Sequence, residues 1–516
     1  MTSRDWLASV ALLVAISVAI AQGKQRLAAP ARHVVVMRRR AVLVFAIPAL
    51  LVSLLGAPAT AATRSFDVRT DHVFRILNVI ERVGAVGDVN GDGLSDLVAS
   101  TYLQDSGHAG ACVVFGSNST DDVDCREPGG RGFLVYRSLV VGNEYNYYPS
   151  SAGDVNGDGY ADVLVIAPRP DRSSGGAPWH WDRLYVILGS SSPASVDLSS
   201  FDEGTQGEAG FTVKSPDDNG LHSPGAAGDI NRDGLDDIVV EHLGRSVAYV
   251  IFGTASESDV DLAAWERGTQ GRRGYRITGP KVPDKTTFQV EMVRRAGDIN
   301  GDGLGDIVIP GWHFSGNPEY SGPAAGTYIA LGKKDGSPIR LRKRGTKSFR
   351  IFGGSWDVEP AGDMNADGKD DLVTVGGGLA TVVFGSKSHT QVDLARLGSR
   401  GYHIVKRSVY GALPEGVDVA PDMNRDGIPE VIVVERTRQT SHMWVVYGQK
   451  GTRNVDVTKL NHHGFRIDGD VYSGTGDDMY RAYAADDFVG VRDITGDARG
   501  EIALRGRNVA YVFAGR

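Results

Sequence analysis

The sequence has almost no cysteine and no long apolar segment beyond its amino end. Of its 516 residues only Cys112 and Cys125 are cysteines. Two thiols lack the partners that a metal or catalytic site requires, and in an exported chain we expect them to form one disulfide. A membrane-spanning helix needs about 20 apolar residues, and no such run follows Leu55. We therefore expect no transmembrane anchor once the amino-terminal leader is removed.

Several chemical signatures are also missing. No stretch keeps a helical period of apolar residues, so long helices are not expected. No basic stripe with interleaved aromatic residues is present, which argues against nucleic acid as a partner. The sequence has no Gly-x-Ser-x-Gly elbow, no His-Glu-x-x-His pair and no phosphate-binding glycine loop. The sequence therefore predicts no catalytic residues and favours a binding protein over an enzyme.

The amino end has the pattern of a leader. Residues 37–62 combine a basic start, an apolar run and small residues suited to signal-peptide cleavage. A second apolar run lies within residues 1–36. We interpret residues 1–36 as upstream sequence wrongly included before Met37; the alternative is a membrane anchor. Residues 63–516 are then the mature domain, which we expect to be monomeric and either secreted or associated with the cell surface.

The most informative feature is a nine-residue phrase, Asp-x-Asn-x-Asp-Gly-x-x-Asp, that occurs seven times, five times in this form and twice as a close copy, at intervals of 59 to 75 residues. Oxygen-bearing side chains stand at positions 1, 3, 5 and 9, and glycine at position 6 permits a sharp turn. Hard oxygen ligands without cysteine or histidine favour Ca²⁺ over zinc. An EF-hand is excluded because position 12 is not glutamate (it is Ala99 in the first copy). The alternative is a hairpin turn that binds no ion, which seven regularly spaced copies disfavour.

The predicted Ca²⁺ ligands are the residues at positions 1, 3, 5 and 9 of each copy: Asp88, Asn90, Asp92, Asp96; Asp154, Asn156, Asp158, Asp162; Asp229, Asn231, Asp233, Asp237; Asp298, Asn300, Asp302, Asp306; Asp363, Asn365, Asp367, Asp371; Asp422, Asn424, Asp426, Glu430; and Asp493, Thr495, Asp497, Glu501. We expect up to seven ions. The seventh copy matches the pattern least, because it also has Ala498 in place of the glycine. The loops hold much of the acidity behind the net charge of −8, so that charge does not indicate a basic partner.

Short strands recur around each loop and predict the fold. A β-branched run such as Ile238-Val239-Val240 follows the loop. A strand ending in glycine comes next, as in Val113 to Gly116, and a fourth strand such as Gly132 to Val135 completes the unit. Seven units of four antiparallel strands predict an all-β fold, a seven-bladed β-propeller. The chain stops after the third strand of its last unit, so we expect the N-terminal strand from Val73 to Ile76 to join the last blade and close the ring.

The glycine-ended strands and aspartate loops together resemble the FG-GAP repeats of the integrin α-subunit head, over residues 73–516. The resemblance implies a propeller with Ca²⁺ in the hairpins between the first two strands of a blade. Because all seven units carry a loop, the pattern is more similar to bacterial FG-GAP proteins than to integrins, in which only some blades do. We find no counterpart of the integrin leg domains and therefore expect no integrin-type signalling.

Strand direction separates the two faces of the propeller. Antiparallel strands alternate, so all seven loops share one face, and the opposite face receives the connections between second and third strands and between blades. Candidate ligand-binding residues in these connections are Trp179, His180, Trp181, Trp312, His313, Tyr145, Tyr147 and Trp356. Exposed aromatic rings on loops held by a rigid scaffold are typical of binding surfaces. The alternative is that these rings fold inward as small satellite cores.

The leading hypothesis is therefore a secreted, Ca²⁺-stabilised propeller that binds an extracellular protein or polysaccharide. One rival is an extracellular polysaccharide lyase or hydrolase on the same scaffold, and another is a structural module without a specific ligand. The fold alone does not choose among them.

Overall fold

The computed structural model describes residues 64–67, 70–103, 108–138, 147–170, 179–180, 182–217, 220–256, 258–269, 271–279, 287–290, 292–314, 327–341, 348–353, 357–376, 379–388, 390–406, 416–436, 441–469, 488–506 and 508–515. All of them belong to one compact unit, Thr63–Arg516. The predicted upstream segment and signal peptide lie outside the described residues. None of the helices in the described part of the chain is long and apolar enough to cross a membrane.

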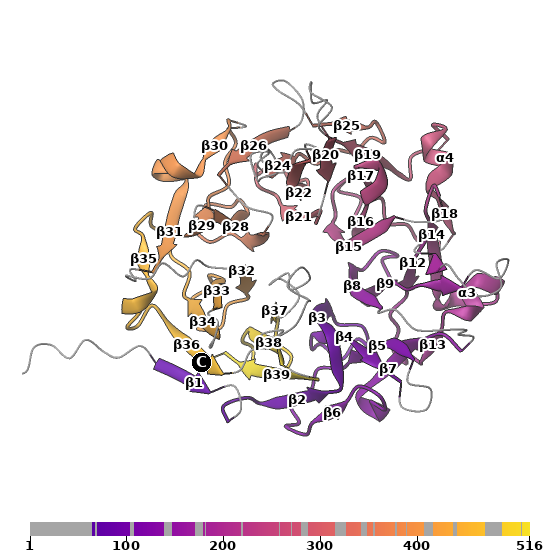
Figure 1. The fold of residues 1–516 in the computed structure, drawn as a ribbon, viewed down its shortest axis with the longest axis horizontal. Helices are drawn as coiled ribbons and strands as arrows, with labels where there is room; N and C mark the ends of the chain where they lie inside the picture. Colours follow the sequence, from indigo (N-terminus) through magenta and orange to yellow (C-terminus); the bar gives the residue numbers. More distant parts are fainter. Residues whose placement is uncertain are drawn as a thin grey trace, which may run out of the picture. The chain divides into compact units, whose positions relative to one another are not determined.

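Seven five-stranded sheets follow one another around a ring (Figure 1). From the inner strand outward, blade 1 contains β3 (Val79–Gly87), β4 (Asp96–Tyr102), β5 (Ala109–Val114), β7 (Gly132–Tyr136) and β13 (Val196–Asp197). Blade 2 contains β8 (Tyr148–Gly153), β9 (Asp162–Ile166), β12 (Arg183–Ile187), β14 (Gly210–Lys214) and β18 (Val260–Asp261). Blade 3 contains β15 (Leu221–Gly228), β16 (Asp237–His242), β17 (Val247–Ile251), β19 (Gly274–Thr278) and β25 (Ile339–Arg340).

The remaining four blades repeat the arrangement. Blade 4 contains β21 (Arg294–Gly297), β22 (Asp306–Ile309), β24 (Thr327–Ala330), β26 (Ser348–Phe352) and β30 (Val392–Asp393). Blade 5 contains β27 (Val358–Gly362), β28 (Asp371–Gly376), β29 (Leu379–Val383), β31 (Gly401–Val405) and β35 (Val455–Asp456). Blade 6 contains β32 (Gly416–Ala420), β33 (Glu430–Arg436), β34 (Ser441–Val446), β36 (Gly464–Gly469) and β1 (Arg64–Asp67). Blade 7 contains β37 (Phe488–Val491), β38 (Glu501–Gly506), β39 (Val509–Ala514), β2 (Phe74–Leu77) and β6 (Val123–Asp124).

The predicted closure of the ring is confirmed. Strand β2 from the amino end pairs antiparallel with β39 from the carboxyl end, with Phe74 opposite Val512 and Leu77 opposite Val509. The last blade is therefore built from both ends of the domain. Because β39 and β2 pair with each other, neither strand has a free edge where the chain ends meet. The pairing therefore removes an edge to which a foreign strand could add.

The prediction of four strands per blade is wrong by one. Each blade has a fifth, outermost strand of two to four residues that runs parallel to the fourth. In six blades this strand comes from the connection between the third and fourth strands of the next blade; β13, for example, lies between β12 and β14 in sequence but pairs with β7. A two-residue segment is too short to show a strand period in the sequence. Each blade thereby covers the edge of the one before it.

The core lies between the blades. Strand β9 is buried along its whole length and β4 along all but its last residue, because these middle strands face a neighbouring blade on both sides. Seven clusters of buried apolar residues each draw on two adjacent blades; one joins Val113 of blade 1 to Val165 of blade 2. Each blade is therefore stabilised mainly by its two neighbours.

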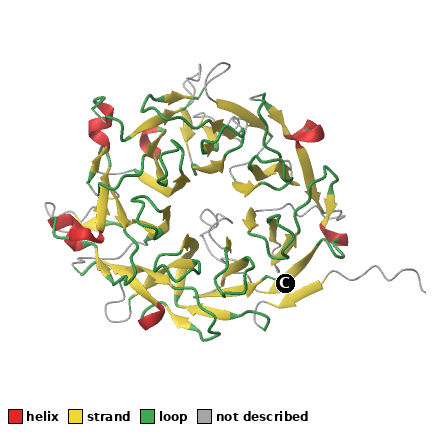
Figure 2. Cartoon of the chain, turned by 180° about the vertical axis from the view of Figure 1, so that it is seen from behind, coloured by secondary structure: helices red, strands yellow, loops and turns green. Residues whose placement is uncertain are grey.

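Most of the short helices lie at the outer edge of the ring (Figure 2), whereas the 3-10 helix η4 (Leu243–Arg245) joins β16 to β17 within blade 3. The other described helices are α3 (Ser199–Glu203), α4 (Leu262–Glu266) and the 3-10 helices η2 (Gly129–Arg131), η3 (Gly207–Ala209), η6 (Leu394–Arg396), η7 (Gly398–Arg400) and η8 (Val457–Lys459). Two further two-stranded sheets pair β10 (Arg169–Pro170) with β11 (Trp179–His180) and β20 (Thr287–Val290) with β23 (Gly311–Phe314).

A disulfide fastens the ring beside its closing strand. It joins Cys112 in β5 to Cys125, which directly follows β6, with the two Cα atoms 5.5 Å apart. Both cysteines are buried in the cluster between blades 7 and 1, together with Phe74 of the closing strand. Since β6 is the outer strand of blade 7 and β5 belongs to blade 1, the bond links these two blades covalently.

Removing the disulfide should weaken the domain. For the double variant Cys112→Ala/Cys125→Ala we expect a loss of about 3 kcal/mol in the free energy of unfolding, as for a closed loop of this size. Denaturant unfolding of the variant against the wild type measures the loss. Adding a reductant should shift the wild type toward the variant and leave the variant unchanged. An unchanged unfolding midpoint in the variant would contradict the expectation.

Candidate functional site

Each aspartate phrase forms the hairpin between the first and second strands of its blade. In blade 1 the loop runs from Asp88, after β3, to Asp96, the first residue of β4. The carboxylate of Asp88 organises it by accepting hydrogen bonds from the N–H groups of Gly91 (2.7 Å), Asp92 (3.1 Å) and Gly93 (2.8 Å). Gly93 has φ of +88°, in the left-handed region that suits glycine. The first position of the phrase therefore shapes the turn itself.

The ninth position ties the loop to the rest of the blade. Asp96 is fully buried and accepts one bond from the N–H of Val89 in the loop (2.8 Å) and another from the N–H of Gly116 after the third strand (2.8 Å). Loops 2 to 5 repeat the second bond, from Gly189, Gly253, Gly332 and Gly385. This carboxylate connects the aspartate phrase to the strand that ends in glycine.

The same contact explains why that strand ends in glycine. A Cβ placed on Gly116 would lie 2.6 Å from the carbonyl oxygen of Ser95 and 2.7 Å from the side chain of Leu94. Such distances are too short for any side chain. The glycine that ends the third strand therefore contacts the aspartate loop. Because this glycine has no side chain, the loop has room to pack against it.

Burial perturbs the ninth carboxylate in every loop. Desolvation raises the pKa of Asp96 to about 7, and the neighbouring carboxylates of Asp92 and Asp88 raise it further, while its two backbone hydrogen bonds oppose the rise. The same causes raise the pKa of Asp306 to about 8 and of Glu430 to about 8. A buried carboxylate with two further carboxylates in the same loop is costly in its charged form unless a cation neutralises it.

Two loops hold buried oxygen atoms without a hydrogen-bond partner among the described residues. These are Oδ1 of Asn231, at position 3 of loop 3, and Oε1 of Glu430, at position 9 of loop 6. A buried acceptor without a donor costs about 1–3 kcal/mol. Both atoms belong to the predicted ligand set, so a hard cation would satisfy them where the protein does not. The donor set therefore fits Ca²⁺.

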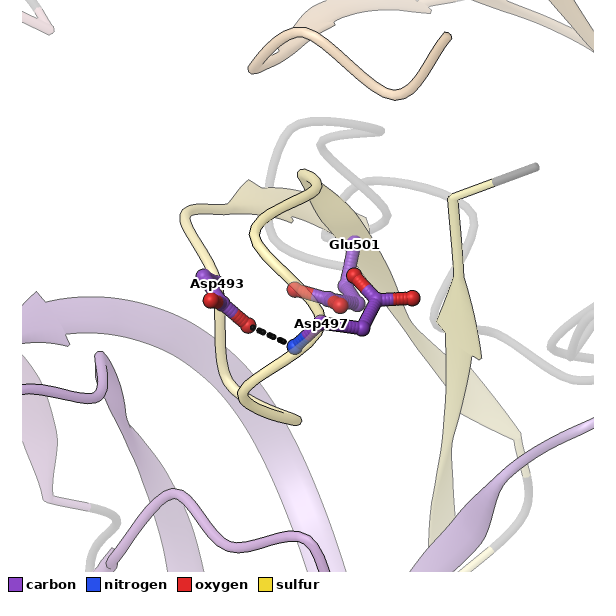
Figure 3. Close-up of side chains that lie close together, drawn as sticks. All are labelled: Asp493, Asp497 and Glu501. Atoms are coloured by element: carbon purple, nitrogen blue, oxygen red, sulfur yellow. Dashed lines mark hydrogen bonds between the residues drawn. The ribbon is translucent and has the colours of Figure 1, made fainter. Parts of the chain in front are cut away.

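The seventh loop, which matches the sequence pattern least, brings its carboxylates closest together. Asp493, Asp497 and Glu501 each place an oxygen within 4.8 Å of the others (Figure 3). Glu501 is one methylene longer than aspartate; its Oε2 accepts from the N–H of Ile494 (2.9 Å), and its Oε1 accepts from the hydroxyl of Thr495 (2.8 Å). The longer side chain thus turns its second oxygen into the loop. Among the described residues this is the cluster with metal-binding spacing.

Known proteins share the repeat. Residues 150–181, which include loop 2, match the FG-GAP repeat family. Over 279 residues the chain is 22% identical to the integrin alpha pat-2 of Caenorhabditis briggsae, and the alignment covers 50% of this chain and 20% of that integrin. These findings and the seven blades fit an integrin-like FG-GAP propeller. The chain spans about a fifth of the length of this curated relative.

Solved structures similar to this propeller include the Dos1 propeller, with a TM-score of 0.39, 8% identity, and coverage of 86% of this chain and 95% of that chain. Sqt1 from Chaetomium thermophilum gives a TM-score of 0.31 and 11% identity, with coverage of 86% and 99%. At these scores the two alignments carry no argument about the blades, which rests on the strand pairing above.

The candidate ligand face of the propeller lies only in part within the described residues. Trp179 and His180 form β11, opposite β10, and Trp312 and His313 lie in β23, opposite β20. The β10–β11 hairpin follows the second strand of blade 2, whereas in blade 4 β20 precedes the first strand and β23 follows the second; both pairs lie at the strand ends away from the aspartate loops. Trp181, Tyr145 and Trp356 lie outside the described residues.

The sequence predicts that Tyr147 is exposed, but the structure buries it. Its side chain is only 3% exposed and packs in the cluster between blades 1 and 2, and its carbonyl accepts a bond from the hydroxyl of Ser100 (2.9 Å). The alternative of an inward-folded ring therefore applies to Tyr147, because its position directly before β8 places it between two blades.

Two features escaped the sequence reasoning. Among the described residues, Tyr102 is the large hydrophobic residue that is exposed, with 46% of its surface accessible. It lies at the end of β4 away from the loops. Val-Asp pairs supply five of the seven outermost strands, and the aspartates of three of them cap the helix that follows; Asp261, for example, accepts from the N–H of Ala263 (2.8 Å). The regular recurrence of Val-Asp between third and fourth strands was the available signal.

The seventh loop offers a test of the turn geometry. Ala498 holds φ of +62°, where the other loops have glycine. Ala498→Gly should therefore raise the free energy of unfolding by about 0.5–1 kcal/mol, by relieving the left-handed strain. Ala194→Gly, at an exposed site without positive φ, is the control and should not stabilise. Equal shifts of the unfolding midpoint in both variants would refute the argument.

Proposed function

We propose that this protein is a calcium-binding propeller in which the seven aspartate loops hold Ca²⁺. The observation that carries the proposal is the unpaired buried oxygen atoms of Asn231 and Glu430 within the loops. The convergence of three carboxylates in loop 7 adds support. In each loop, side-chain oxygens at positions 1, 3, 5 and 9 would surround the ion. The positive charge of the ion would offset the negative charge of the carboxylates. The ion acts as scaffold, since it sits within a hairpin that joins two strands.

Calcium should stabilise the domain and each loop should hold one ion. Each occupied site adds about 2.7 kcal/mol when free Ca²⁺ exceeds its dissociation constant a hundredfold. Chelation should therefore lower the melting temperature, and Ca²⁺ should restore it. Asp158→Ala and Asp302→Ala should each reduce the number of ions bound in equilibrium dialysis by one.

The control is Glu127→Ala, which removes an exposed acid outside the loops and should leave the stoichiometry unchanged. If chelation does not change the melting temperature of the wild type, the loops are turns that bind no ion.

We further propose that the protein acts outside the cell as a binding or adhesion module for a protein or a polysaccharide. The loops occupy one face, so the connections at the opposite ends of the strands are left for recognition. Trp179 and Trp312 lie in short paired strands at these ends, and the exposed Tyr102 ends β4 on the same side. Aromatic side chains at such positions suit stacking on sugars or the capture of a protein segment. The similarity to an integrin is in keeping with this role.

Binding should be lost when the aromatic residues of this face are removed. We expect Trp179→Ala combined with Trp312→Ala to abolish binding in glycan arrays and pull-downs, because stacking area is lost. Tyr160→Ala, in loop 2 on the calcium face, is the matched control and should bind as the wild type does. Unchanged binding by the double variant would move recognition away from this face. Turnover of a bound polysaccharide would instead favour the enzymatic alternative.

A further inference from the structure

The calcium loops contact one another from blade to blade. The backbone N–H at position 8 of a loop donates a hydrogen bond to the carbonyl of the first aspartate in the preceding loop. The pairs are Ser95 to Asp493 (2.9 Å), Ala161 to Asp88 (2.8 Å), Asp236 to Asp154 (2.9 Å), Gly305 to Asp229 (3.3 Å), Asp370 to Asp298 (3.0 Å) and Gly500 to Asp422 (3.0 Å). We call this series the loop belt. It crosses the junction between blades 7 and 1, where the two chain ends meet.

Further contacts reinforce the belt. The N–H of Ser190, after the third strand of blade 2, donates to the carbonyl of Val89 in loop 1 (3.0 Å). The ring of Tyr160 in loop 2 lies against Gly91 of loop 1, where a Cβ would be 2.5 Å from it. A side-chain hydrogen bond also joins loop 5 to loop 4. Oδ2 of Asp370 accepts it from the N–H of Asp298 (2.7 Å). Adjacent loops are therefore packed together as well as hydrogen-bonded.

One junction lacks this bond. Position 8 of loop 6 is Pro429, which has no N–H to donate to the carbonyl of Asp363 in loop 5. Among the described residues of loops 5 and 6, no backbone hydrogen bond joins the two loops. Blades 5 and 6 are held at their inner strands instead, where Asp357 accepts from the N–H of Val417 (2.7 Å). The belt is thus open at a place remote from the chain ends.

The first aspartate of a loop has two roles. The carboxylate of Asp422 shapes loop 6 by accepting from the N–H groups of Asp426 and Gly427, and its carbonyl accepts the bond from Gly500 of loop 7. An ion that fixes this aspartate also fixes the acceptor of the neighbouring loop. The neighbour then loses less conformational entropy when its own ion binds, which is positive coupling.

We propose that the loop belt couples the calcium sites of adjacent blades, and that Pro429 interrupts the coupling between blades 5 and 6. The seven sites then behave as a linear array that begins at blade 6, passes through the junction of the chain ends and finishes at blade 5. This inference rests on the calcium binding proposed above.

Hydrogen exchange of the full chain, in Ca²⁺ and in chelator, tests the proposal loop by loop. Asp426→Ala removes a ligand of loop 6. In Ca²⁺ it should lower the protection of the loop 7 amides (493–500) about two- to tenfold, which is the range of one net hydrogen bond. It should leave loop 5 (363–370) unchanged. Asp302→Ala in loop 4 is the matched comparison and should lower protection in both its neighbours, loops 3 and 5.

Restoring the missing donor gives the complementary test. In Pro429→Ala the new amide should be protected, and Asp426→Ala in that background should lower protection in loop 5 as well as loop 7. Pro193→Ala, in a connection outside the belt, controls for the general effect of losing a proline and should not extend the response to loop 5.

The outcomes separate this inference from calcium binding itself. If Asp426→Ala disturbs loops 5 and 7 equally in the presence of Pro429, or disturbs neither, the coupling is overturned. If the wild type exchanges identically in Ca²⁺ and in chelator, calcium binding fails. The coupling through the loop belt is then tested in chelator alone. Under that condition Pro429→Ala should raise the hydrogen-exchange protection of the loop 5 amides, and unchanged protection would overturn the coupling.

Discussion

The buried carboxylate at the ninth position of each loop is the contact on which a blade depends. Asp96 receives one N–H from its own loop and one from Gly116 at the end of the third strand. It thus fixes the hairpin between the first two strands against the third. Its burial is unfavourable for a charge, as the raised pKa records. A cation bound as proposed would resolve this conflict and would link ion binding to the fold of the blade through the same atoms.

The ring is assembled from blades that complete one another. The outermost strand of one blade is supplied by the chain of the next, as β13 is to blade 1, and the apolar clusters lie between blades. The junction of the chain ends is fastened by the β2–β39 pairing and by the disulfide beside it. This junction is therefore closed by backbone pairing and by a covalent bond. The face that carries the aspartate loops departs from regularity between blades 5 and 6, at Pro429.

The sequence predicted those features that repeat with a strong local signal. The aspartate loops, the seven blades and the closing role of the strand from Val73 to Ile76 followed from spacing and strand pattern, and the strand pairing confirms the fold. The fifth strand was missed because two residues carry no period. The burial of Tyr147 was missed because its surroundings come from the neighbouring blade. The convergence in loop 7 depended on where the extra methylene of Glu501 directs its carboxylate.

The sequence by itself determined the number of blades, the candidate ion ligands and the chemistry of the site, because each is written in residues close together in the chain. The tertiary structure decided how the loops meet one another. The bonds between position 8 and the preceding loop join residues 72 to 82 positions apart in the five pairs that follow the chain, and a sixth bond, between Ser95 and Asp493, joins blade 1 to blade 7. No local pattern specifies such partners. They come together only when the blades pack around the ring and bring each carbonyl within reach of the next amide.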